Sequence, residues 1–137
     1  MKEKKLKKKI LYNFRIFNYF PYFEYCNYFG YLLRYKQILK SKFVEKFIVL
    51  TDMGLIIFNN PLLPPKHIIS LEKSKIKKYK EITYGKPFGF EIISYNQTYI
   101  FFAKTEESLN KWIIEIQKIT QRYLCDIKNF NFKNESI

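Results

Sequence analysis

Short apolar runs separated by polar turns fill the chain from Gly30 to Ala103. The runs are rich in β-branched and aromatic residues, and none repeats at the three- and four-residue spacing of a helix. Turn-forming residues separate them, among them Asp52, Gly54 and the three prolines of residues 61–65. The pattern predicts seven strands in an antiparallel barrel or sandwich. These strands are residues 31–35, 43–51, 55–58, 67–71, 75–82, 88–94 and 98–103.

After Ala103 the apolar positions take on the period of a helix. Thr105 is a suitable N-cap, and Glu106 and Glu107 follow in the first turn, where the helix dipole favours negative charge. We therefore expect one helix that ends at about Arg122. The fold class is mainly β with one C-terminal α-helix, a seven-stranded antiparallel barrel or sandwich capped by that helix. The apolar stripe consists of Leu109, Trp112, Ile113, Ile116, Ile119 and Tyr123.

The two ends of the chain lie outside this domain, which we place at residues 29–123. Residues 124–137 read as a loose polar tail, and residues 1–28 are a basic extension rich in aromatic residues. Polar residues interrupt the apolar stretch of the extension, so neither a transmembrane helix nor a secretion signal is expected. Helical spacing between residues 6 and 17 allows a basic amphipathic helix at a membrane interface. A disordered or locally packed extension is the other interpretation.

The formal net charge of +13 suggests an anionic partner, although part of it reflects a composition typical of AT-rich codons, with 22 Lys and 3 Arg. The distribution of this charge is more informative than its total. Residues 1–29, 30–50 and 66–86 carry +5, +4 and +5, whereas residues 87–137 are neutral. Composition alone would spread the lysines more evenly, so the positive field is polarised.

Residues suited to catalysis or metal binding are sparse. Cys26 and Cys125 lie at opposite ends and predict neither a disulfide nor a metal site, so we expect a reducing, cytoplasmic location. The lone His67 precedes an apolar run and is interpreted as a surface or edge histidine. The four glycines form no phosphate-binding loop, and the acidic residues form no paired motif. We expect a non-catalytic protein without a cofactor or a metal.

The order of these elements resembles a pleckstrin homology (PH) domain over residues 29 to about 122. The segment from Gly30 to Arg34 is similar to the family's first strand, and the segment from Lys46 to Asp52 to its second. Trp112 resembles the nearly invariant Trp of the family's helix. It lies on the apolar stripe, where we expect it to close one end of the barrel and to be structural. Two shorter matches are Ile69-Ser-Leu-Glu72 and Lys86-Pro-Phe-Gly-Phe-Glu91.

The resemblance implies a ligand site at the open end of the barrel, where such domains bind inositol phosphates of membrane lipids. Arg34 and Lys46 match cation positions on the first and second strands, but Val44 occupies another such position and the third strand lacks the family's Tyr. Low lipid selectivity is therefore expected. The intervening loop adds cations around an apolar tip, which suits an anionic membrane surface. The predicted lipid-binding residues are Arg34, Lys36, Lys40, Lys42 and Lys46, with Ile38 and Leu39 at the tip.

Two functions follow, and the sequence leaves both open. The first is recruitment to membranes through anionic lipids, either phosphoinositides or phosphatidate. The second is a protein-interaction or adaptor module, with a partner along the fifth strand and the helix or on an exposed edge. Nucleic acid is not an expected partner because no recognised motif is present. The lysines of residues 73–86 fit either an edge strand protected from aggregation or a second membrane contact.

Overall fold

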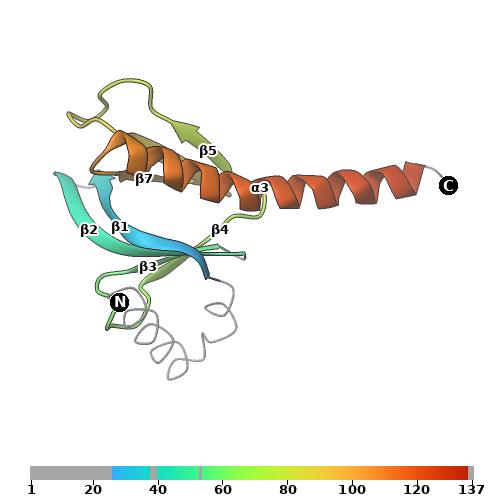
Figure 1. The fold of residues 1–137 in the computed structure, drawn as a ribbon, viewed down its shortest axis with the longest axis horizontal. Coiled ribbons are helices and arrows are strands. Elements are labelled where there is room, and N and C mark those ends of the chain that lie inside the picture. The colour runs from blue at the N-terminus through green and yellow to red at the C-terminus, as the bar shows by residue number, and fades with distance from the viewer. Residues whose placement is uncertain (1–25, 38–39, 53, 136–137) are drawn as a thin grey trace.

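The computed structural model describes residues 26–37, 40–52 and 54–135, and it contains one strongly curved sheet and one long helix (Figure 1). Seven antiparallel strands precede the helix, which confirms the predicted fold class. The elements are β1 (Cys26–Gln37), β2 (Ser41–Thr51), β3 (Gly54–Phe58), β4 (His67–Ser70), β5 (Lys75–Lys78), β6 (Gly89–Ser94), β7 (Gln97–Phe102) and α3 (Glu106–Glu135).

The sheet runs in the order β4-β3-β2-β1-β7-β6-β5, so β4 and β5 are its edge strands. The long hairpin of β1 and β2 is its centre, and β1 passes from β2 to β7 by pairing Leu33 with Phe102. The edge strand β4 meets β6 through a side chain, because Ser94 Oγ donates a hydrogen bond to the Ser70 carbonyl at 2.7 Å. The barrel is thus partly open, and α3 lies across one opening (Figure 1).

The core fills the concave side of the sheet under α3. Strand alternation turns Leu32, Ile48 and Ile57 to this side, where they are buried with four residues of α3, Leu109, Trp112, Ile116 and Ile119. Trp112 is 1% exposed and meets the ring of Tyr28 edge-on, with ring centroids 4.6 Å apart. The helix is therefore held to the barrel by burial of a large aromatic surface.

The opposite face of β2 and β3 also carries buried apolar residues, which the sequence pattern did not predict. Phe47 and Phe58 are fully buried there, and the rings of Phe29 and Tyr31 pack on Phe47 at centroid distances of 5.8 and 5.1 Å. All five residues of β3 are buried. Both faces of these central strands therefore contribute apolar packing, and this explains why β3 reads as a continuous apolar run.

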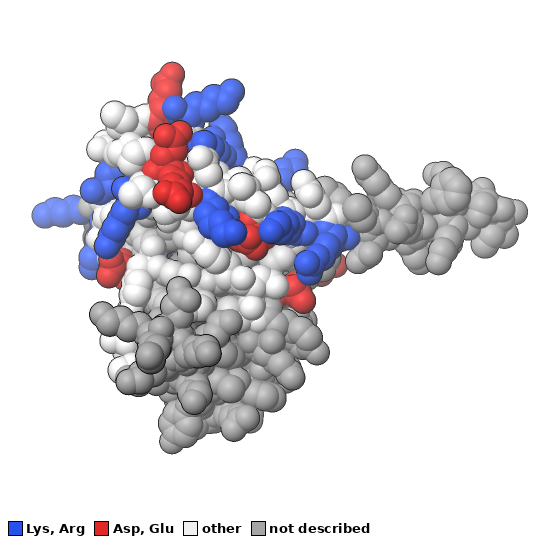
Figure 2. Space-filling model, in the orientation of Figure 1, with Lys and Arg blue, Asp and Glu red and all other residues white. Residues whose placement is uncertain are grey.

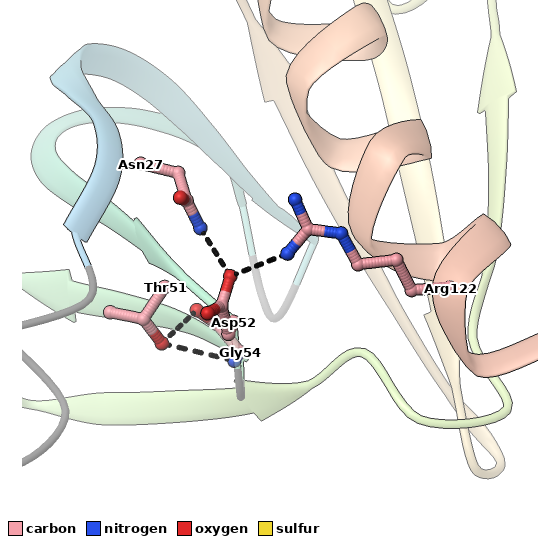
Figure 3. Close-up of polar contacts among 5 residues, drawn as sticks. All are labelled: Asn27, Thr51, Asp52, Gly54 and Arg122. Atoms are coloured by element: carbon pink, nitrogen blue, oxygen red, sulfur yellow. Dashed lines mark hydrogen bonds and ion pairs between the residues drawn. The ribbon is translucent and has the colours of Figure 1, made fainter. Parts of the chain in front are cut away.

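Polar contacts fix the end of the barrel where β2 turns into β3 (Figure 3). Asp52 Oδ1 accepts a hydrogen bond from Asn27 Nδ2 at 2.7 Å and an ion pair from the Arg122 guanidinium at 3.0 Å. The buried Thr51 hydroxyl donates to the Gly54 carbonyl and accepts from the Gly54 amide. One turn thus joins the start of β1 to the middle of α3.

Three element boundaries differ from those predicted by more than two residues. β1 begins at Cys26, because the aromatic segment before Gly30 pairs with β2, as in the register of Tyr28 with Leu50. β5 ends at Lys78, because the chain then turns through Tyr84 and Gly85, both with positive φ. The helix continues past residue 122 to Glu135, since no Gly or Pro follows Ala103 to stop it. The predicted loose tail is therefore largely helical.

Some predictions fall outside the described residues. These are the alternatives for the extension up to residue 25 and the apolar tip at Ile38 and Leu39.

Candidate functional site

The β1–β2 hairpin places its cations on the inner face of the barrel. Its register sets Arg34 opposite Val44 and Lys36 opposite Lys42, and residues directly opposite each other share a face. Alternation along the strands puts them on the same face as the core residues Leu32 and Ile48, beyond the point where the core ends. The cations therefore surround the open mouth of the barrel.

A concavity of about 480 Å³ lies at this mouth. It opens between the β1–β2 hairpin and the β3–β4 connection, because antiparallel order brings both connections to the same end of the sheet. Lys46 Nζ donates a hydrogen bond to Asn59 Oδ1 across it. Among the described residues that line it, none is acidic. The lining consists of Arg34, Lys36, Lys46, Ile57, Asn59, Lys66 and His67.

The cations at the mouth have no acidic partners within the described part of the chain. The ion pairs in the described part of the chain lie elsewhere, and they join Lys104 to Glu45, Glu115 to two lysines of α3, and Arg122 to Asp52. Glu45 lies on the opposite face of β2 from Lys46 and pairs with Lys104 at 3.7 Å, so its negative charge does not compensate the cations at the mouth. Figure 2 shows Lys and Arg side chains at the end that carries the hairpin, with acidic side chains near them, and basic and acidic side chains are also mixed along α3.

The pKa values report the same crowding of positive charge. The pKa of Lys36 is lowered mainly by the neighbouring charge of Arg34, and that of Lys46 mainly by burial and then by the surrounding cations. Burial also lowers the pKa of Arg34. Each shift means that the positive form is destabilised where it stands. A bound anion would relieve this destabilisation, which makes the mouth suited to phosphate.

His67 and Tyr99 connect the mouth to the wall formed by β7. His67 Nε2 and the Tyr99 hydroxyl lie 2.9 Å apart, and that hydroxyl donates to Gln97 Oε1 at 2.7 Å. The Arg34 guanidinium lies over the Tyr99 ring, 5.5 Å from its centroid. The pKa of His67 is lowered, first by burial and then by repulsion from Arg34 and Lys36. The ring is therefore neutral at pH 7 and can donate or accept a hydrogen bond.

The structure brings together only part of the predicted set. Arg34, Lys36 and Lys46 line the concavity, and Lys42 is exposed beside Lys36. Lys40 is exposed nearer the tip of the hairpin and does not line it.

Sequence reasoning missed Asn59, Lys66 and His67. The signal was available, because in an antiparallel meander the third-to-fourth connection must lie beside the first-to-second. The register of Ile57 with His67 brings the start of β4 to that rim. His67 is the first residue of the edge strand β4, which agrees with its interpretation as a surface or edge histidine.

The second lysine cluster lies at the opposite edge of the sheet. β5 is an edge strand, and Lys75 and Lys77 are exposed on it. At its end, Lys78 Nζ donates to Asn110 Oδ1 of α3 at 2.7 Å. A peptide docked between β5 and α3 would have to break this contact.

The described residues contain neither a metal-binding group nor a membrane-spanning helix. Among these residues, no group of three or more His, Cys, Asp or Glu side chains could hold a metal ion. No helix among them is both long and apolar enough to cross a membrane.

The curved seven-stranded sheet with one C-terminal helix defines the class of this protein. The PH domain family model matches residues 27–121, so the chain belongs to the PH domain family. A comparison with curated proteins gave no match.

Solved PH domains share the fold at low sequence identity. The Slm1 PH domain in complex with phosphoserine is 20% identical, with a TM-score of 0.63 over 72% of this chain and 98% of that one. The C-terminal PH domain of pleckstrin in complex with D-myo-Ins(1,2,3,5,6)P5 is also 20% identical, with a TM-score of 0.60 over 69% and 95%. The PH domain of human KIAA0053 protein is 17% identical, with a TM-score of 0.59 over 70% and 89%.

Proposed function

We propose that this PH domain protein is a non-catalytic module that binds anionic membrane lipids and thereby associates peripherally with membranes in the cytoplasm. The observation that carries the proposal is the concavity at the open end of the barrel, lined by Arg34, Lys36, Lys46 and Lys66 without an acidic partner among the described residues. The pleckstrin domain of the same fold was solved with an inositol phosphate, which supports a phosphorylated headgroup as ligand.

Selectivity among anionic lipids is proposed to be low. A selective site needs several charge-assisted hydrogen bonds converging on one headgroup. Val44 lies opposite Arg34 and supplies an apolar side chain where the family places a cation, which removes one such bond. The remaining lysines act mainly as charges, at about 1 kcal/mol for each cation near an anionic surface. Phosphoinositides and phosphatidate of matched total charge should therefore bind with similar affinity.

The test is charge reversal at the concavity. The triple variant Lys36→Glu, Lys46→Glu and Lys66→Glu should weaken sedimentation with vesicles containing phosphatidylinositol 4,5-bisphosphate at least about a hundredfold, because three near-surface cations contribute about 3 kcal/mol. Circular dichroism should show that the variant remains folded.

The matched control reverses three lysines at the opposite edge of the sheet. Lys73→Glu, Lys75→Glu and Lys77→Glu change the net charge equally, and all three side chains are exposed. This control should keep most of the vesicle affinity. Equal losses in both triples would mean that the concavity is not the site. Retention of a protein partner at high salt, without vesicle binding, would favour the adaptor function instead.

A further inference from the structure

The loop between β3 and β4 carries two exposed leucines at the rim of the basic concavity. Leu62 and Leu63 are 54% and 50% exposed. The two ends of the loop, Asn59 and Lys66, both line the concavity. The leucines are therefore only a few residues from a lining residue on either side, Asn59 before them and Lys66 after them, and the loop and the concavity share one rim.

Backbone contacts hold this loop in one shape. The Leu62 amide donates to Asn60 Oδ1 at 2.9 Å, and the Leu63 amide donates to the Asn60 carbonyl at 3.0 Å. The Lys66 amide closes the loop onto the Ile57 carbonyl at 2.8 Å. Three prolines, at positions 61, 64 and 65, further restrict the backbone. Such a loop presents its apolar side chains with little entropy left to lose on binding.

The packing of the barrel does not require leucine at these positions. The leucines that do stabilise the barrel, such as Leu55 and Leu71, are at most 1% exposed. A single exposed leucine is ordinary on a protein surface. Two adjacent ones beside several unpaired cations form the amphipathic pattern of a segment that lies in a membrane interface.

We propose that the β3–β4 loop inserts Leu62 and Leu63 into the apolar layer of an anionic bilayer while the concavity holds a lipid headgroup. The proposal rests on the proposed function. A bilayer is the occupant that fits, because it offers negative charge at its surface and acyl chains directly beneath, and the rim carries both cations and exposed leucines. For a headgroup to pass between Asn59 and Lys66, the loop that joins them must reach the bilayer surface.

Removing the apolar side chains tests the proposal. The double variant Leu62→Gln and Leu63→Gln should bind vesicles containing phosphatidylinositol 4,5-bisphosphate with at most about one tenth of the wild-type affinity, because the burial of two leucines is lost. Its affinity for soluble inositol hexakisphosphate should match that of the wild type, since that ligand offers no apolar layer. Ile114→Gln is the matched control, because Ile114 is 50% exposed on α3, and it should leave both affinities unchanged.

A tryptophan at the loop reports insertion directly. Trp112 is the chain's one tryptophan and is buried in the core, so a Leu63→Trp variant adds a separate, exposed fluorophore. On anionic vesicles with brominated acyl chains, its emission should shift to the blue and be quenched. The wild type should show neither change.

The outcomes separate this inference from the function on which it rests. A wild type that fails to sediment with anionic vesicles overturns both. A second outcome would overturn only the insertion. In it, the wild type binds vesicles and the lysine triple variant does not, but the glutamine double variant binds as the wild type does and the tryptophan of Leu63→Trp is not quenched. Equal losses of vesicle and inositol hexakisphosphate affinity in the double variant would also overturn it, because the leucines would then serve the headgroup site itself.

Discussion

Strand alternation decides which charged residues of the β1–β2 hairpin face the concavity. Lys46 and Glu45 are adjacent in sequence, yet they point to opposite faces of β2, and Glu45 pairs with Lys104 away from the site. Val44, by contrast, lies on the inner face opposite Arg34, where it can affect the site. Its effect on lipid selectivity remains a prediction.

His67 should make lipid binding depend on pH. Its pKa is lowered by burial and by the charges of Arg34 and Lys36, so binding an anion beside these cations should raise it. A proton is then taken up on binding, and affinity increases as the pH falls. Between pH 7.5 and pH 5.5, affinity for phosphatidylserine vesicles should rise about fivefold, the effect of one added cation.

A His67→Gln variant is the control for this effect. Glutamine can keep a hydrogen bond to Tyr99 but gains no charge, so the increase at low pH should disappear. His67 is the only histidine in the chain, which makes the assignment direct. A wild type whose affinity is constant over this range would contradict the prediction. Stability should change in the opposite direction: a lowered pKa in the folded state means that His67 stabilises the fold above pH 6.5 and less so as the pH falls.

At the scale of elements, two antiparallel hairpins bring the site together. The β1–β2 hairpin supplies Arg34, Lys36 and Lys46, and the β3–β4 connection supplies Asn59, Lys66 and His67. Gly54, at the turn between β2 and β3, lies opposite Ser70 at one end of the β3–β4 pairing, where the two strands pack closely. A Cβ at Gly54 would lie 2.4 Å from the Ile69 carbonyl oxygen of β4.

The variant Gly54→Ala should therefore destabilise the fold. The contact is with backbone, which can move away only by disturbing the β3–β4 pairing, so we expect a loss of about 1 to 3 kcal/mol in the free energy of unfolding. Gly30→Ala is the control, because its Cβ would meet only Trp112 Cζ2, at 3.4 Å. Chemical denaturation of both variants measures the difference. Equal stabilities would show that β4 is not packed on the Gly54 turn as described.

The sequence predicted elements better than their ends or their neighbours. All seven strands were predicted because their apolar runs and turn residues are local signals. The end of α3 was misplaced because the segment after Cys125 was interpreted as polar, although Ile127 and Phe130 continue the helical spacing and no stop signal follows. Lys66 and His67 were not assigned to the site because their position depends on the register of β4 with β3, which no local pattern carries.

At the scale of the whole molecule, the uncompensated positive charge at the mouth lies apart from the ion-paired charges along α3. The mouth of the barrel gathers cations from two strands and a loop, whereas acidic partners accompany the cations described along α3. A field of this kind orients a protein as it approaches an anionic surface. The exposed leucines of the β3–β4 loop lie at the same rim, so charge and apolar surface point in one direction.

The most direct test is to map the ligand site by NMR. Titration of the full chain with soluble inositol hexakisphosphate should shift the backbone amides of Arg34, Lys36, Lys46 and Asn59, together with the ring signals of His67. Amides of β5 and of α3 should stay in place. Shifts confined to β5 and α3, or no shifts at millimolar ligand, would contradict an anion site at the open end of the barrel.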